Sequence, residues 1–155
     1  ILGELSPNNS MNDLSYAYLE CIKKSNSVSL HVRRGDYLNL KNINVLDVDY
    51  YMKAVEYIRK NVEKPTFYIF SDDLEWCKRH LGFVDGCIYV DRTQNEIDDL
   101  KLMSFCQHNI IANSSFSWWG AWLNQNRKKT VIAPKGWLLN DPGSSNVILS
   151  DWVKF

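Results

Sequence analysis

The sequence has no surplus of charge of either sign, which excludes one large class of binding proteins. Its 155 residues hold 18 Lys and Arg against 18 Asp and Glu, for a formal net charge of zero. Proteins that bind nucleic acids need an excess of basic residues on one face. We therefore expect no nucleic-acid partner, and any anion site must be a local cluster of donors.

Long apolar runs and paired cysteines are also lacking. No apolar stretch approaches the roughly 20 residues that a membrane span needs, and no signal peptide is visible. The four cysteines include no CxxC pair, which disfavours a zinc site or a disulfide framework. Three of them lie inside apolar runs, where reduced and buried cysteines are usual. The composition therefore favours a reducing, cytoplasmic setting.

Two common nucleotide-binding motifs are absent. The sequence contains neither GxGxxG nor GxxxxGK[ST], which disfavours a nicotinamide-dependent dehydrogenase and a P-loop enzyme. The "DVD" at 47–49 resembles a metal-binding DxD, but it opens a predicted helix and is interpreted as a helix cap. No Ser/His/Asp arrangement for nucleophilic catalysis suggests itself.

What the sequence does contain is an alternation of short apolar runs and longer amphipathic segments. The apolar runs, typical of strands buried on both faces of a parallel sheet, are 28–32, 66–70, 87–90, 109–112 and 130–133. Helices are expected between them, at 11–25, 48–62, 74–82, 95–107 and 115–126. This pattern predicts an α/β fold: a three-layer Rossmann-like domain with a mainly parallel sheet, in which residues 1–155 form a single domain. One more short strand is expected at "VILS" (147–150).

An arginine pair follows the first predicted strand, at its carboxyl end, where parallel sheets bind ligands. Arg33 and Arg34 carry planar guanidinium groups that match phosphate oxygens two at a time, and Gly35 allows a sharp turn beside a ligand. A surface ion pair with Asp36 is the simpler alternative. Arg34-Gly35-Asp36 is also the tripeptide of adhesion proteins. An adhesion module would show it on an exposed loop, whereas here a buried strand runs straight into it.

A second candidate follows the predicted strand at 109–112. Asn113, Ser114 and Ser115 precede a helix, so that free backbone N–H groups and the helix dipole favour an anion there. Plain N-capping is the simpler explanation for the serines. Three aromatic residues of that helix are expected to pack it onto the sheet rather than to stack on a ligand: Trp118, Trp119 and Trp122.

Acidic residues provide the remaining candidates. Asp72 and Asp73 end the second predicted strand, where either can cap the next helix or bind a ribose hydroxyl, with capping favoured. Asp98 and Asp99 lie within a helix, where one carboxylate normally faces solvent. The pattern alone singles out neither of them.

Three segments together closely resemble the donor-binding half of the α-1,2-fucosyltransferases, glycosyltransferase family 11. They are "HVRRGDY" (31–37), "FYIFSDD" (67–73) and "DDLKLMSFCQHNIIANSSFSWWGAWL" (98–123), and their order and spacing match. The resemblance implies a GT-B-like enzyme of two Rossmann-like domains, with GDP-fucose held mainly by the C-terminal one. Because the chain starts at Ile1 and has the length of one domain, we expect the acceptor-side domain to be absent from it.

The resemblance implies roles for the arginine loop. Arg33 would bind the diphosphate and stabilise the charge that develops on the leaving GDP, and Arg34 would support that loop or the sugar. A base must also deprotonate the acceptor, and the sequence offers no definite one. Asp36 is the catalytic candidate, although anchoring of the arginine loop is the favoured role for it. Asp72 is a weaker candidate for contact with ribose or guanine.

The resemblance also implies how the base and phosphate are held. In related fucosyltransferases an aspartate sixteen positions before the phosphate-contacting serine accepts from the base edge, and Asp99 lies sixteen positions before Ser115. His31 and Asp99 would therefore hold guanine. Ser114, Ser115 and Phe116 would line the β-phosphate and the base or fucose.

The expected activity is transfer of fucose from GDP-fucose to the 2-hydroxyl of a terminal galactose, with inversion. We expect no cofactor and no metal, because an arginine pair and a helix N-terminus can replace a divalent cation. The expected partners are GDP-fucose and a galactose-terminated glycan, in a bacterial-type cytoplasm, with peripheral association at the inner membrane through the full-length protein left open. The isolated chain should bind nucleotide and transfer sugar poorly. Another nucleotide-sugar glycosyltransferase of this architecture and an adhesion module are the alternatives.

Overall fold

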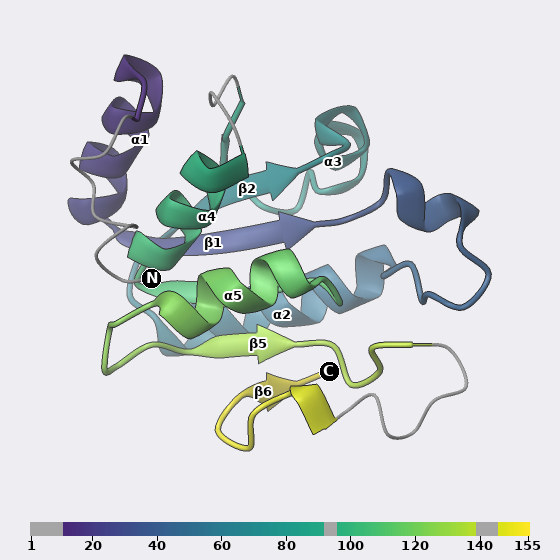
Figure 1. Cartoon of the computed structure of the whole chain (residues 1–155). Coiled ribbons are helices and arrows are strands. Elements are labelled where there is room, and N and C mark those ends of the chain that lie inside the picture. The colour runs from purple at the N-terminus through teal and green to yellow at the C-terminus, as the bar shows by residue number, and fades with distance from the viewer. Residues whose placement is uncertain (1–10, 92–95, 139–145) are drawn as a thin grey trace.

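A six-stranded parallel sheet forms the centre of the fold (Figure 1). The computed structural model describes residues 11–91, 96–138 and 146–155. The strands are β1 (Asn26–Val32), β2 (Pro65–Ser71), β3 (Ile88–Tyr89), β4 (His108–Ile110), β5 (Val131–Ala133) and β6 (Val153–Lys154). They lie in the order β3-β2-β1-β4-β5-β6, and every pairing is parallel. This is the strand order of doubly wound Rossmann sheets, so the predicted fold class is confirmed.

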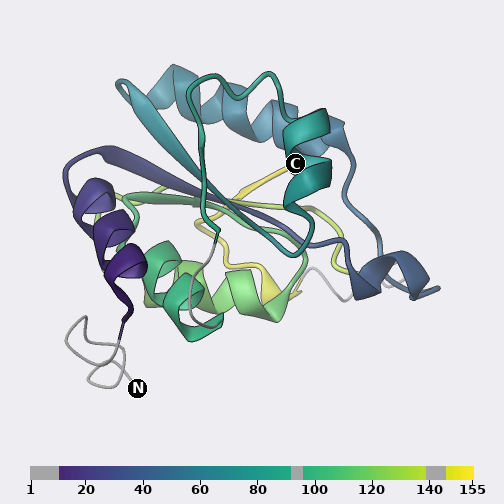
Figure 2. The same ribbon diagram turned by 90° about the horizontal axis from the view of Figure 1, so that it is seen from above.

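Helices cover both faces of the sheet, as the view from above shows (Figure 2). They are α1 (Asp13–Lys23), α2 (Val48–Asn61), α3 (Leu74–His80), α4 (Glu96–Phe105) and α5 (Ser115–Leu123), with a short 3-10 helix η1 (Asp36–Asn39) after β1. Helices α2 and α3 pack on one face, and α1, α4 and α5 on the other. Asn12, Asp47 and Asp73 cap α1, α2 and α3 through side-chain oxygens that accept from the backbone. The predicted cap at "DVD" is thereby confirmed.

Strand β1 sends alternate side chains to the two faces, because the side-chain period of a strand is two. Val28, Leu30 and Val32 are buried in the cluster that contains α2 and α3. His31 points to the other face, where its ring centroid lies 5.7 Å from that of Phe116 in α5. By the same alternation, Arg33 points to the side of His31 and Arg34 points to the side of α3.

A buried polar cluster joins β1, β4 and α5 and is called the Asn109 network below. The Asn109 side-chain amide donates to Ser29 Oγ (2.7 Å) and to the Met103 carbonyl (2.9 Å). Its Oδ1 accepts from Asn124 Nδ2 at 2.7 Å. Gly120 brings α5 close to α4, because a Cβ there would stand 3.1 Å from Met103 Cβ. The helices that carry Ser115 and Asp99 are thus fixed against each other.

Two expectations about the carboxyl-terminal third are wrong. Residues 147–150 form no strand; Ile148 is buried beneath α5, and the last strand is β6, which pairs with β5. The apolar character of that stretch serves packing rather than a strand. Trp118 packs inward as expected, but the side chains of Trp119 and Trp122 are 45% and 49% exposed. No helix in the three described ranges is long and apolar enough to cross a membrane.

Candidate functional site

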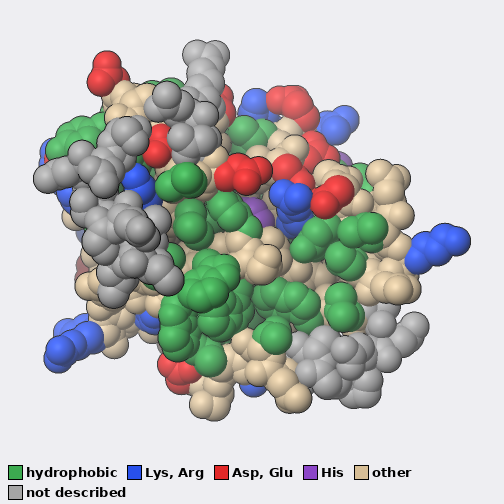
Figure 3. Space-filling model, viewed as in Figure 1, with side chains coloured by type: hydrophobic (Ala, Val, Ile, Leu, Met, Phe, Trp, Pro, Cys, Tyr) green, Lys and Arg blue, Asp and Glu red, His purple; other side chains and the backbone are tan. Residues whose placement is uncertain are grey.

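A cavity of about 380 Å³ opens where β1, β2 and β4 end, and we call it the carboxyl-edge pocket. Its lining comes from four segments that are far apart in the sequence: His31, Arg33, Asp36, Tyr37, Phe70, Ser71, Asp72, Glu96, Asp99, Ser114, Ser115 and Phe116. Strands β1 and β4 are neighbours at the point where the strand order reverses, which is where open α/β sheets bind ligands. Acidic, basic and histidine side chains meet near the middle of this face (Figure 3).

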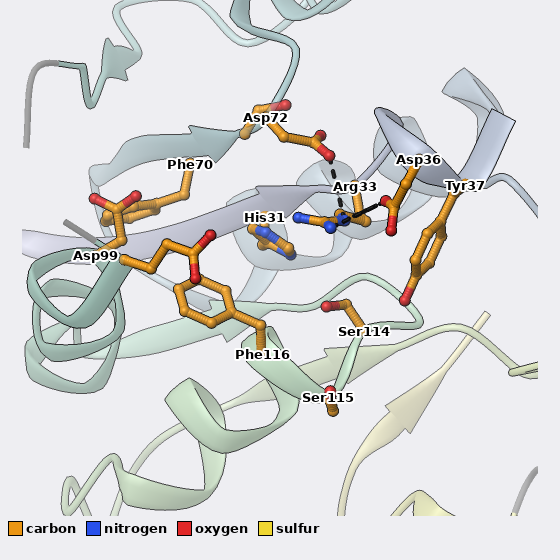
Figure 4. A pocket seen from close by; sticks show the side chains of 12 residues that line it. His31, Arg33, Asp36, Tyr37, Phe70, Asp72, Asp99, Ser114, Ser115 and Phe116 are labelled. Atoms are coloured by element: carbon orange, nitrogen blue, oxygen red, sulfur yellow. Dashed lines mark hydrogen bonds and ion pairs between the residues drawn. The ribbon is translucent and has the colours of Figure 1, made fainter. Parts of the chain in front are cut away.

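Arg33 reaches into the pocket between two carboxylates (Figure 4). Its Nη2 lies 3.0 Å from Asp36 Oδ1, and its Nε lies 3.2 Å from Asp72 Oδ2. The guanidinium carbon also stands 5.5 Å from the centroid of the Tyr37 ring. Asp36 is the more exposed carboxylate, at 59% of its side chain against 24% for Asp72. An incoming anion can therefore displace Asp36 and leave Asp72 in place.

Arg34 lies outside the pocket, on the other face of the sheet. Its guanidinium carbon is 4.1 Å from the centroid of the Trp76 ring, and its Nε is 3.8 Å from Asp73 Oδ2. Its side chain is only 17% exposed. These contacts suit support of the loop, and Arg34 is not among the described residues that line the pocket. They also remove the basis for an adhesion module, because the arginine of the tripeptide is packed against α3 rather than displayed.

Asp72 braces the arginine loop from the neighbouring strand. Its Oδ1 accepts the backbone N–H of Arg34 at 2.9 Å, while Oδ2 holds Arg33. Gly35 makes this approach possible, because a Cβ there would stand 2.6 Å from Asp72 Oδ2. The adjacent Asp73 caps α3 by accepting from the backbone N–H of Trp76 at 2.9 Å. The two neighbouring aspartates therefore have separate roles.

His31 lies in the wall of the pocket as a neutral imidazole. Its side chain is 4% exposed, and burial, followed by the nearby charge of Arg33, lowers its pKa to about 3. Its Nδ1 is buried without a hydrogen-bond partner in the described structure. Such a group is uncommon in folded proteins and calls for an explanation, such as an unfilled binding role.

The first turn of α5 closes one side of the pocket. Ser114 occupies the N-cap position, but its hydroxyl makes no capping hydrogen bond, so plain N-capping does not explain this serine. Ser115 is the first helical residue, where backbone N–H groups lack partners within the helix. The preceding Asn113 has a structural role, because its side-chain amide donates to the carbonyls of Asn44 (2.8 Å) and Trp137 (2.9 Å).

Helix α4 contributes the acidic end of the pocket. Asp99 lies beside Phe70 at the opposite end from Asp36 and Tyr37 (Figure 4). Its neighbour Asp98 is 1% exposed and does not line the cavity. The structure therefore separates two adjacent acids that the helical pattern could not distinguish.

Sequence reasoning assigned no role to four lining residues: Tyr37, Phe70, Ser71 and Glu96. Their positions in the sequence could nevertheless have indicated a place in the pocket. Phe70 and Ser71 are the last residues of β2, at the edge where ligands bind. Glu96 precedes Asp99 by three positions, so both lie on one side of α4. Tyr37 belongs to the arginine motif, and its hydroxyl donates to the Asn113 carbonyl at 3.2 Å.

Among the described residues, the lining of the pocket carries more negative than positive charge. Arg33 is the one Lys or Arg side chain that the described ranges contribute, against the carboxylates of Asp36, Asp72, Glu96 and Asp99. An anion would therefore bind at the Arg33 end, beside the amino end of α5, and not at the acidic end. Within the described ranges no group of three or more His, Cys, Asp or Glu side chains could hold a metal ion.

The fold and the pocket together define a Rossmann-like α/β domain with a ligand pocket at the strand-order reversal. The family model of Glycosyl transferase family 11 matches residues 4–155. The chain therefore belongs to glycosyltransferase family 11, and the predicted family is confirmed.

Curated relatives agree with this membership. The O-antigen biosynthesis glycosyltransferase WbnK of Escherichia coli is 36% identical over 151 residues, which are 94% of this chain and 50% of that protein. An alpha-1,2-colitosyltransferase of Escherichia coli is 38% identical over 128 residues (76% and 43%). The human galactoside alpha-(1,2)-fucosyltransferase 1 is 33% identical over 104 residues (62% and 28%). The chain thus spans about half the length of the bacterial relatives it matches.

Proposed function

We propose that the chain is the donor-binding part of an α-1,2-fucosyltransferase and that GDP-fucose occupies the carboxyl-edge pocket. One observation carries the proposal: Arg33, the amino end of α5 and Asp99 line a single cavity. A nucleotide sugar needs cationic or N–H donors at its central diphosphate and a partner for its base at one end. The pocket has hydrogen-bond donors at the ends of β1 and β4, where the diphosphate would lie. The carboxylate of Asp99 lies at its far end, where the base would lie.

At the phosphate end, Arg33 provides a fork that matches two oxygens, and the first turn of α5 provides N–H groups and a favourable dipole. The hydroxyl of Ser114, which makes no capping bond, is a further donor. The diphosphate takes the place of exposed Asp36 on Arg33. Asp72 keeps Arg33 oriented during this exchange, because the Arg34 backbone also holds it.

At the base end, Asp99 accepts hydrogen bonds from the donor edge of guanine, whose adjacent N–H groups suit a carboxylate. Neutral His31 offers one donor and one acceptor, and its buried Nδ1 gains the partner that it lacks. Phe116, close to His31, adds an aromatic wall for the base or the sugar. Uracil does not present this donor edge, so the pocket should prefer GDP to UDP.

In the transfer step, the 2-hydroxyl oxygen of the acceptor bonds to C1 of fucose from the side opposite the nucleotide. The bond from C1 to the β-phosphate oxygen breaks, GDP leaves with the electron pair, and the configuration inverts. The hydroxyl proton passes to a carboxylate, for which Asp36 at the exposed rim is our candidate. Arg33 stabilises the growing phosphate charge, an interaction whose loss typically costs about 3–4 kcal/mol. The proposal requires no metal ion.

The acceptor that we propose is a terminal galactose, as in the name of the human relative. The colitosyltransferase relative favours a second candidate, in which the transferred sugar is colitose. Both donors would bind through the same phosphate end and base end of the pocket, and they differ only in the sugar that is transferred. The full-length protein, incubated with lactose and either activated sugar, would distinguish them by which product forms.

Calorimetric titration of the chain with GDP, UDP and ADP, each with and without magnesium, tests the donor assignment. We expect GDP to bind at least about tenfold more tightly than the other two, a difference of roughly 1.4 kcal/mol, with no requirement for magnesium. A preference for UDP or ADP would rule out the fucosyl donor and leave another nucleotide-sugar transferase. Binding of GDP only with magnesium would overturn the metal-free part of the proposal.

A further inference from the structure

Two tryptophans remain exposed on the outer side of α5, although each indole has a large apolar surface. The side chains of Trp119 and Trp122 are 45% and 49% exposed, whereas Trp118 packs against the cluster beneath the helix. Exposed apolar patches of this kind usually mark a binding surface, because leaving them in water costs free energy.

The two exposed rings are held in fixed positions by Trp118. Its ring is stacked on that of Trp122 (centroids 5.3 Å apart, planes at 10°) and meets that of Trp119 edge to face (5.2 Å, 86°). Trp118 is itself anchored, because its Nε1 donates to the Val147 carbonyl at 2.8 Å. A surface that is already rigid loses little conformational entropy when it binds a ligand.

This aromatic surface is continuous with the carboxyl-edge pocket. Ser115, Trp119 and Trp122 are the exposed residues of α5, at the spacing that places them along one side of a helix. The helical rise puts the two tryptophans about 6 Å and about 10 Å along the axis from Ser115. Ser115 lines the pocket, and a hydrophobic patch lies on the same face as the charged side chains of the pocket (Figure 3).

The chemistry of this surface fits a sugar chain. A pyranose ring has a face of C–H groups that packs on an indole and an edge of hydroxyl groups that stays in water. Ser115, Trp119 and Trp122 carry no charge, so their side of α5 suits a neutral glycan better than a nucleotide or an acidic peptide. We propose that Trp119 and Trp122 form a platform that binds pyranose rings of the acceptor glycan next to the donor pocket. This inference rests on the proposed function, which requires an acceptor to reach that pocket.

Saturation-transfer difference NMR of the chain with lactose tests the platform. We expect saturation on the C–H protons of the galactose ring and a loss of at least about fivefold in the double variant Trp119→Ala/Trp122→Ala. GDP affinity, measured by calorimetry on the same samples, should change less than about twofold. The matched control is Met52→Ala, which removes an exposed apolar side chain from α2 on the opposite face. This variant should keep the full lactose signal.

The outcomes separate the platform from the donor assignment. Lactose contact with failed GDP binding would support the platform and overturn the proposed function. GDP binding without lactose contact, or a lactose signal that survives in the double variant, would overturn the platform alone. A double variant that changes only the sedimentation coefficient would make this side of α5 an interface between copies of the chain, which also overturns the platform.

Discussion

Two buried polar regions of this protein differ in whether the protein itself satisfies them. In the Asn109 network, both ends of the Asn109 side chain have partners at 2.7–2.9 Å. In the carboxyl-edge pocket, His31 Nδ1 has none and the Ser114 hydroxyl caps nothing. Buried polar groups that serve the fold are normally paired within the protein. The two groups left open at the carboxyl edge belong to residues that line the cavity, so they are our candidates for contact with a ligand.

The largest effect is expected where the polar groups are fully paired. Asn109→Leu removes three hydrogen bonds and leaves Asn124 Nδ2 without its Asn109 partner, so the free energy of unfolding should fall by about 3–4 kcal/mol. Urea denaturation measures this change. Ser114→Ala is the matched variant from the pocket and should change stability by less than about 0.5 kcal/mol. Equal losses in both variants would abolish the contrast between the two regions.

The next effect concerns the two adjacent arginines. Arg33→Ala should weaken GDP binding about 100-fold, or about 3 kcal/mol, because charge-assisted hydrogen bonds to the diphosphate are lost. Arg34→Ala should mainly reduce stability, by about 1 kcal/mol, through loss of its stacking on Trp76. Calorimetry and urea denaturation of both variants measure the two quantities. The assignment fails if Arg34→Ala loses GDP affinity and Arg33→Ala keeps it.

A smaller effect follows from the buried imidazole. The pKa of His31 is about 3 in the folded chain and near 6.5 in the unfolded chain, so the unfolded state binds more protons between these values. The free energy of unfolding should therefore fall as the pH drops below about 6, by roughly 1.4 kcal/mol per unit from this residue. His31→Gln should flatten that slope between pH 6 and 5, as measured by urea denaturation.

The control for this pH dependence is His108→Gln. Burial also lowers the pKa of His108, but that side chain is only partly buried, so its replacement should flatten the slope less. The interpretation of His31 as a neutral, pocket-lining group would be refuted by a His31→Gln variant whose slope matches that of the parent protein.

The smallest effect is expected at the rim of the pocket. Asp36→Asn removes the exposed carboxylate that competes with the diphosphate for Arg33, and exposed pairs contribute about 0.2–1 kcal/mol. GDP affinity should therefore rise by about two- to fivefold in calorimetry. Glu56→Gln, which neutralises an exposed acid on α2, should leave the affinity unchanged. Weaker GDP binding by Asp36→Asn would instead mean that Asp36 positions Arg33.

The sequence predicted most of the sheet, because its longer strands, β1 and β2, are runs rich in apolar residues and are buried on both faces. The runs at 28–32 and 66–70 lie within β1 and β2, and the observed strands extend them by at most two residues at either end. Strand β6 was missed because two residues leave no periodic signal and the strand exists through its pairing with β5. The exposure of Trp119 and Trp122 was also missed, because a helix apolar on every side does not reveal which side is covered.

The site was predictable in part. The rule that ligands bind at the carboxyl ends of parallel strands brought the arginine loop and the two serines together, and the structure places both at one pocket. Arg33 and Arg34 point to opposite sides of the sheet, and only one side carries the pocket. The local sequence does not specify which side that is. Asp99 was singled out only through the family resemblance, since an acid on a helix ordinarily faces water.

The strict two-sided alternation of β1 constrains how this segment can change during evolution. Inserting or deleting one residue between Val28 and Arg33 would turn Arg33 toward α3 and bring its neighbour over the cavity, while reversing every core contact of the strand. Insertions or deletions in this segment should prevent both folding and ligand binding. Insertions and deletions in homologous genes should accordingly fall after η1, where the chain has left both the sheet and the pocket.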